Sequence, residues 1–124
     1  MDLNKLTETW VTRVDSIGPV VEAESEIADK KRELTKKGMS ALHSQKLFRL
    51  LLTKPAGGEE LPLPVFFNII ERLARYDGSA AWCVAQGNGC AMLGAYLDPT
   101  LSENIWGKNQ SGILAWGPGK AEAT

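Results

Sequence analysis

Few residues of this chain have the types and spacing that chemistry requires. The only histidine is His43, so no catalytic set built on more than one histidine can form, and no zinc-ligand spacing is present. We expect His43 to be exposed, because the residues after it are polar. Cys83 and Cys90 stand seven residues apart, which on one helix separates them by about 10 Å along the axis. That distance is too long for a disulfide, so we expect two thiols, a reducing compartment and no bound metal.

Trp82 is the one bulky ring in a stretch of small residues. Each glycine inside a helix costs about 1 kcal/mol relative to alanine, so a helix that contains three must gain from the close approach of another helix or of a ligand. Trp82 is therefore either a wall of a ligand pocket or a core tryptophan that fills the space left by its neighbours. Those neighbours are Ala80, Ala81, Ala85, Gly87, Gly89, Ala91, Gly94 and Ala95.

Asn88 and Cys90 follow Trp82 on the glycine-flanked part of the same stretch. As pocket residues, both would be able to hydrogen-bond a substrate. The alternatives are that Asn88 caps a local kink and that Cys90 is a small buried hydrophobic residue. No cationic neighbour is evident that would make Cys90 reactive.

Length and composition are those of one ordinary globular domain. The chain has 124 residues, of which 44% are hydrophobic and 23% charged, with a formal net charge of −1. Such a charge argues against bulk nucleic-acid binding. No apolar run follows a basic start, so no signal peptide is expected. The uncharged stretch Gly78–Leu97 contains Gln86, Asn88 and several glycines, which favours a buried helix over a membrane span. We expect a cytoplasmic protein.

Apolar residues at helical spacing and capping residues predict about six helices and a final strand. Gly18-Pro19 is expected to interrupt the first helix, because proline suits the first turn of a new one. Asp77 and Ser79 both offer caps to the helix that contains Trp82. The predicted elements are helices over Leu3–Ile17, from Pro19 to Arg32, from a cap at Thr35 through Leu42, from Pro64 onward, over Ser79–Leu97 and from Pro99 to Trp106, a run over Leu47–Leu52 that is either a strand or a turn of helix, a loop over 54–60, and a strand over Ser111–Trp116.

These elements describe an all-α body that ends where a strand begins. Trp10 and Trp106 are the expected core anchors. A lone strand cannot form a sheet, so the strand either pairs with another chain or belongs to a domain that continues further. We favour the second interpretation, with residues 1–110 as an N-terminal α-helical domain and residues 111–124 as the first strand of a truncated β domain. The buried face of the fourth helix is predicted to consist of Phe66, Phe67, Ile69, Ile70 and Leu73.

Three stretches resemble the acyl-CoA dehydrogenase superfamily. Residues 47–50 together with 57–61 are similar to its leucine-phenylalanine and glycine-glycine passage. Residues 70–82 resemble its Glu-x-Leu-Ala-Arg-x-Asp-x-Ser signature, and the trailing Ala-Ala-Trp resembles the two-component flavin monooxygenase branch. Residues 113–118 stand where members have a flavin-contacting strand. The resemblance extends from about Glu22 to the end of the chain.

The resemblance implies a fold and a function. The fold is a helical N-terminal domain, a β-barrel domain and a C-terminal four-helix bundle, of which only the first is complete here. The function is that of a flavin-dependent oxidoreductase, a monooxygenase that takes reduced FMN or FAD from a separate flavin reductase and uses O2 to oxygenate an aromatic or other apolar small molecule. The resemblance also implies a homotetramer, and it leaves the catalytic residues unknown, beyond Thr124. This chain alone is expected to be inactive.

The same resemblance assigns roles to residues of this chain. Trp82, Ile113, Ala115 and Trp116 are implied to contact the flavin, with backbone groups of the strand beside its rings. Asn88 and Cys90 are implied to contact the substrate. An ordinary β-strand is the alternative for residues 113–116.

Two other functions are compatible with these residues. One is an acyl-CoA dehydrogenase, which removes hydrogens across an acyl thioester with bound FAD. The other, from a different class, is a helical interaction module without catalysis. A downstream β domain and bundle would eliminate the module, and a glutamate base facing the flavin would support the dehydrogenase.

Overall fold

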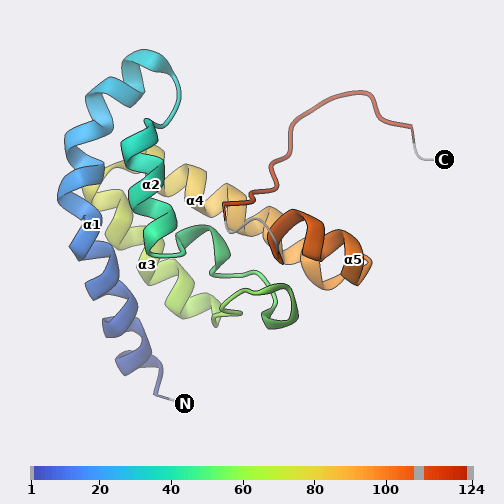
Figure 1. Cartoon of the computed structure of the whole chain (residues 1–124). Coiled ribbons are helices and arrows are strands. Elements are labelled where there is room, and N and C mark those ends of the chain that lie inside the picture. Colours follow the sequence, from blue (N-terminus) through green and yellow to red (C-terminus); the bar gives the residue numbers. More distant parts are fainter. Residues whose placement is uncertain (1, 108–110, 123–124) are drawn as a thin grey trace.

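The computed structural model describes residues 2–107 and 111–122, and every regular element within them is helical (Figure 1). The predicted fold class is thereby confirmed. No strand occurs among the described residues. The α-helices are α1 (Leu3–Lys31), α2 (Lys36–Ser44), α3 (Leu63–Tyr76), α4 (Gly78–Ala91) and α5 (Pro99–Ser102), joined by the 3-10 turns η1 (Leu47–Arg49), η2 (Lys54–Ala56) and η3 (Met92–Ala95) and followed by the π-helical turn η4 (Glu103–Gly107).

α1 is one continuous helix, so the predicted interruption at Gly18-Pro19 is wrong. Pro19 removes the backbone donor that the carbonyl of Asp15 would otherwise bind, at a cost of about 3 kcal/mol. The packing of α1 along α3 offsets this cost. Gly18 is buried on the side that faces α3, whereas Pro19 is exposed. Tertiary contacts therefore override the local helix-breaking signal.

α2 and α4 begin at the capping residues that were predicted for them. The Thr35 hydroxyl accepts the backbone N–H of Gly38 at the start of α2. The Asp77 carboxylate accepts the N–H groups of Ser79 and Ala80 at the start of α4. Each cap satisfies a donor that the first turn of a helix leaves without a partner. Within the ambiguous run Leu47–Leu52, Leu47–Arg49 forms a 3-10 turn and none of these residues forms a strand.

Two groups of buried side chains hold the helices together. The larger one lies between α1, α2, α3, α4 and η1 and includes Trp10, which is 3% exposed. The smaller one joins Leu52, Ala56 and Ala91 to Trp106, which is 1% exposed. Both tryptophans are thus core anchors, as predicted. α4 contributes to both groups, so its position is fixed along its length.

Two burial predictions are wrong. Phe67 was expected on the buried face of α3 but is 61% exposed, and Val65 is fully buried. This face of α3 is turned so that Val65, Phe66, Ile69 and Leu73 meet the core. His43 is partly buried rather than exposed, because its ring lies 5.1 Å from that of Phe48. Burial, and then the nearby charge of Arg49, lower the pKa of His43.

Residues 111–122 leave the helical body as an extended chain that passes α4 (Figure 1). They form neither helix nor strand in the described structure. The division into a helical domain over 1–110 and a β domain from 111 stays a prediction, because strand pairing needs a second strand; residues 108–110 and 123–124 lie outside the described part. None of the helices in that part is long and apolar enough to cross a membrane.

Candidate functional site

α4 presents Trp82 on its outer face. The helix turns Ala81, Val84 and Asn88 toward the core, and each of these is buried. Trp82 lies on the opposite side and is 67% exposed. The ring therefore does not fill the core of the described chain. It is available as a wall for something that approaches α4 from outside.

A mostly apolar pocket of about 370 Å³ opens beside Trp82. Four separate segments supply its lining. We refer to it as the Trp82 pocket. The lining residues are Leu34 and Met39 from the α1–α2 region, Phe48 from η1, Trp82, Cys83, Gln86 and Gly87 from α4, and Ile113 and Ala115 from the extended C-terminal segment.

The C-terminal segment is held at this pocket by two contacts. The Trp116 indole N–H donates to the Gln86 side-chain oxygen at 2.7 Å. Ile113 packs against the main core and comes close to Gly87. Of the four residues predicted to contact a flavin, Trp82, Ile113 and Ala115 line this pocket. The fourth, Trp116, is hydrogen-bonded to the lining residue Gln86. The structure thus brings the predicted cofactor residues together, and their role stays a prediction.

Asn88 and Cys90 do not line the Trp82 pocket. The Asn88 amide donates to the carbonyls of Leu47 and Val84 at 2.7 and 2.8 Å and accepts the N–H of Leu51 at 3.0 Å. These bonds tie α4 to η1 and occupy the side chain with backbone partners. Cys90 is buried at 8% exposure. The structure therefore separates the two predicted substrate residues from Trp82, and their role toward a substrate remains a prediction.

Cys83 is the thiol that reaches the pocket. Both cysteines are free, as predicted, and Cys83 is exposed. Burial, and then the charge of Asp77, raise the pKa of the Cys83 thiol. A raised pKa disfavours the thiolate, which is the nucleophilic form of cysteine.

Sequence reasoning missed several lining residues. Gln86 stands four positions after Trp82, a spacing that places both on one face of a helix. The sequence therefore contained a pattern that predicts Gln86 beside Trp82. Phe48 reaches the pocket from a different element. No local pattern links it to α4, since their contact depends on the tertiary fold.

A second cavity, of about 500 Å³, lies at the other end of α4, between η2 and α5. The guanidinium of Arg49 is buried at its edge and donates to the carbonyls of Gly57 and Trp106. Burial lowers the pKa of Arg49. These bonds tie the loop after η2 to η4, which is a structural role. Within the described residues, no group of three or more acidic, histidine or cysteine side chains can hold a metal ion.

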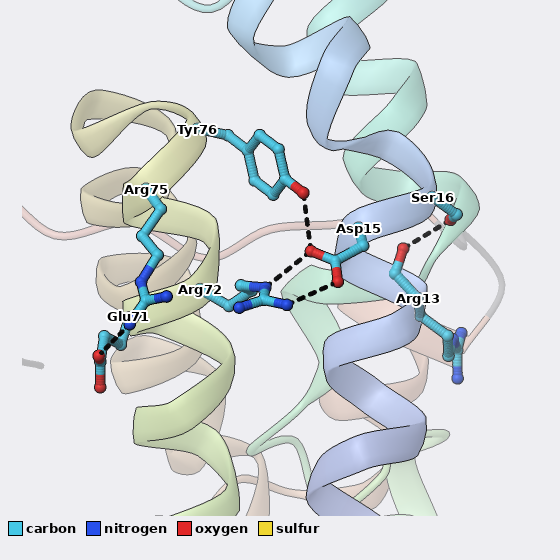
Figure 2. Close-up of polar contacts among 7 residues, drawn as sticks. All are labelled: Arg13, Asp15, Ser16, Glu71, Arg72, Arg75 and Tyr76. Atoms are coloured by element: carbon cyan, nitrogen blue, oxygen red, sulfur yellow. Dashed lines mark hydrogen bonds and ion pairs between the residues drawn. The ribbon is translucent and has the colours of Figure 1, made fainter.

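A polar network fixes the α3–α4 junction onto α1 (Figure 2). Arg72 donates from Nε and Nη2 to the two carboxylate oxygens of Asp15 at 2.8 and 2.9 Å. The Tyr76 hydroxyl donates to Asp15 Oδ1 at 2.7 Å. Hydrogen bonds from Arg72 and then Tyr76 lower the pKa of Asp15 to about 2. Because Tyr76 directly precedes the Asp77 cap, this network helps to position the start of α4 and therefore Trp82.

The chain was compared with known protein families and with individual proteins of known function. No known family's sequence model matches the chain. An indole-3-acetate monooxygenase from Pseudomonas putida is 30% identical over 89 residues, which are 72% of this chain and 23% of that protein. An indole-3-acetate monooxygenase from Acinetobacter baumannii is 39% identical over 57 residues, which are 46% of this chain and 15% of that protein.

The fold also matches a solved structure. XiaF from Streptomyces sp., in complex with FADH2 and glycerol, shares it with a TM-score of 0.83 and 22% sequence identity, over 90% of this chain and 28% of the XiaF chain. The chain spans less than a third of the length of each of these three proteins. These similarities confirm the predicted resemblance at the level of the fold: the chain shares the helical fold of part of the FADH2-bound XiaF, and part of its sequence is similar to indole-3-acetate monooxygenases.

Proposed function

We propose that this chain is the N-terminal part of a flavin-dependent monooxygenase that uses reduced flavin and O2 to oxygenate an aromatic or other apolar substrate. The observation that carries the proposal is the Trp82 pocket, where an outward-facing tryptophan of α4 meets the C-terminal segment. The two indole-3-acetate monooxygenases and the FADH2-bound XiaF support the same class of activity.

The residues at the pocket suit a planar, largely apolar group. Trp82 offers an exposed ring for stacking, and offset stacking of aromatic rings contributes about 0.5–1.5 kcal/mol beyond burial. Gly87 leaves bare helix backbone on the pocket wall. Gln86 adds one side-chain amide, whose oxygen accepts from Trp116. An apolar pocket with few convergent polar groups is the usual form of a small-molecule site.

Bound reduced flavin would supply the electrons that activate O2. The chain's own residues would orient the bound flavin and the substrate and would exclude water from them. In the proposed protein, Trp82, Ile113, Ala115 and Trp116 contact the flavin, and Leu34, Met39 and Phe48 provide apolar walls against which an aromatic substrate is held. A site closed by such walls keeps water from reactive groups. The flavin is either FMN or FAD.

The proposal includes two partners. Reduced flavin is supplied by a separate flavin reductase, and four copies of the full-length protein assemble. Analytical ultracentrifugation of the full-length protein tests the assembly, since a tetramer is expected. Activity that requires an added NADH-dependent reductase, or chemically reduced flavin in its place, tests the electron source.

Oxygen transfer is tested with isotopically labelled O2. The full-length protein, chemically reduced FMN or FAD and indole-3-acetate as an aromatic probe are mixed under 18O2, and products are examined by mass spectrometry. Incorporation of one labelled oxygen atom into the aromatic product is expected. Absence of label with either flavin across a panel of aromatic acids and phenols, together with oxidation of an acyl-CoA by an artificial electron acceptor, would overturn the proposal in favour of a dehydrogenase.

A further inference from the structure

We propose that Gly87 and Asn88 set the depth of the Trp82 pocket and so the size of the aromatic group that it accepts. This inference rests on the proposed function, because it assigns the pocket to a planar ligand. Gly87 lines the pocket without a side chain, and Asn88 holds the backbone on both sides of the neighbouring lining residue Phe48.

Gly87 lies where two side chains from distant segments converge on α4. A Cβ at this position would stand 2.9 Å from Phe48 Cδ1 and 3.3 Å from Ile113 Cγ2. The first distance is shorter than real Cβ contacts, so one side chain must move if position 87 carries a methyl group. Gly87, Phe48 and Ile113 all line the Trp82 pocket. The missing side chain is therefore part of the shape of the pocket.

Asn88 limits the directions in which Phe48 can move to relieve the overlap with a methyl group at position 87. Its amide bonds to the carbonyl of Leu47 and to the N–H of Leu51, on both sides of Phe48 in the chain. A third bond, to the carbonyl of Val84, holds the amide to α4 itself. Asn88 is fully buried, so losing any of these bonds would leave a polar group without a partner. The backbone around Phe48 is consequently fixed relative to α4.

The side of the Phe48 ring that faces away from the pocket is also packed against other residues. Phe48 is 4% exposed, and its ring lies 5.1 Å from that of His43. With its backbone held by Asn88, the ring can give way mainly toward the open pocket. A methyl group at position 87 would thus fill pocket volume twice, by its own atoms and by those of the displaced ring or of Ile113.

The matched control lies two residues further along the same helix. Gly89 is exposed, and a Cβ there would meet no atom within 4 Å. Gly87→Ala and Gly89→Ala therefore change helix propensity equally, but only the first places atoms at the pocket. Any difference between the two variants in ligand preference reports on the pocket rather than on the helix.

The test measures binding without turnover. Isothermal titration calorimetry in the absence of flavin measures the affinity of the protein for phenol, indole and 2-phenylindole. The three affinities together form the size profile of the wild type or of a variant. We expect Gly87→Ala to weaken the binding of indole and 2-phenylindole at least tenfold while phenol changes less than threefold, and Gly89→Ala to reproduce the wild-type profile. The double variant Gly87→Ala with Phe48→Leu should regain most of the lost affinity for indole, since the smaller side chain frees volume next to the methyl group.

The outcomes separate this inference from the proposed function. Equal profiles for Gly87→Ala and wild type would overturn the inference, as would a wild type that binds none of the three probes. An intact size effect in a protein that transfers no labelled oxygen would contradict only the proposed function. A uniform loss across all three probes that Phe48→Leu fails to rescue would show a structural defect at Gly87 and would also overturn the inference.

Discussion

The ring of Tyr76 lies directly over the backbone of Gly18, so that a Cβ on Gly18 would stand 2.3 Å from Tyr76 Cζ. This contact joins the middle of α1 to the last residue of α3. The hydroxyl of the same tyrosine reaches Asp15, one turn earlier on α1 (Figure 2). α1 therefore supports the junction from which α4 begins.

Gly18→Ala is expected to destabilise the chain, because the new methyl group overlaps an aromatic ring that is held from both ends. Overpacking of a well-packed contact costs about 1–3 kcal/mol. Chemical denaturation monitored by circular dichroism measures the change. Gly89→Ala is the control, since it meets no neighbouring atom and should raise the free energy of unfolding by up to about 1 kcal/mol. A Gly18→Ala variant as stable as the wild type would contradict the close contact between Gly18 and the ring of Tyr76.

The same contact explains what the sequence could and could not predict. Helix starts at Thr35 and Asp77 were predicted because a cap is a local hydrogen bond between neighbours in the chain. The continuity of α1 through Pro19 was not, because it depends on α3. The grouping of Trp82 with Ile113 and Ala115 followed from family resemblance rather than from spacing, and the wall at Phe48 had no local signal.

The pH dependence of stability should reveal Asp15. Its carboxyl pKa falls from 3.8 to about 2 on folding, so the unfolded chain binds the proton more tightly than the folded one does. The stabilisation is complete above about pH 4 and is lost as the pH falls through 2. We expect about 1 kcal/mol, because the side chains of Asp15 and Arg72 are each 35% exposed and solvent screens the pair. Urea unfolding between pH 2 and 5 measures it.

Asp15→Asn is the matched variant for that experiment. It keeps the shape of the side chain but removes the titrating proton. Its stability should vary less between pH 4 and pH 2 than that of the wild type, and the two curves should converge at the acid end. Parallel curves would show that another carboxyl group carries the effect.

Asn88→Ala should be among the more destabilising polar substitutions in this chain. It leaves the N–H of Leu51 and the carbonyl of Leu47 without their present partner inside the protein. A buried polar group without a partner costs about 1–3 kcal/mol. Asn68→Ala on the exposed side of α3 is the control and should change stability by about 0.5 kcal/mol or less. Thermal melts of the two variants side by side would decide, and equal melting temperatures would refute the bridging role.

The 124-residue chain should associate with itself at high concentration. Several large apolar side chains are at least 46% exposed, and contiguous apolar surface favours association. Multi-angle light scattering across a concentration series, together with ANS fluorescence, checks the prediction. A monomer that binds no ANS would contradict it. The exposed residues in question are Trp82, Met92, Leu93, Tyr96, Leu101 and Trp116.

Flavin retention offers a further check on the same chain. The flavin-contacting residues proposed here come from one face of α4 and one extended segment, so the pocket is open. We expect the 124-residue chain to lose flavin during gel filtration and to be inactive. Stoichiometric flavin that remains bound through the column would show that this chain holds the cofactor alone.

Trp82→Ala in the full-length protein should separate function from stability. Trp82 is 67% exposed in this chain, so its removal should cost far less than the 3–5 kcal/mol or so that is typical of a buried tryptophan. Trp106→Ala is the control, since that ring is 1% exposed and should show the full loss. If Trp82 walls the proposed flavin site, its loss admits water, and reduced flavin and O2 then yield more hydrogen peroxide and less oxygenated product. Product formed per peroxide released, measured with the melting temperature, decides between the roles. A large drop in melting temperature with unchanged coupling would assign Trp82 to packing, and would remove it from the proposed flavin site.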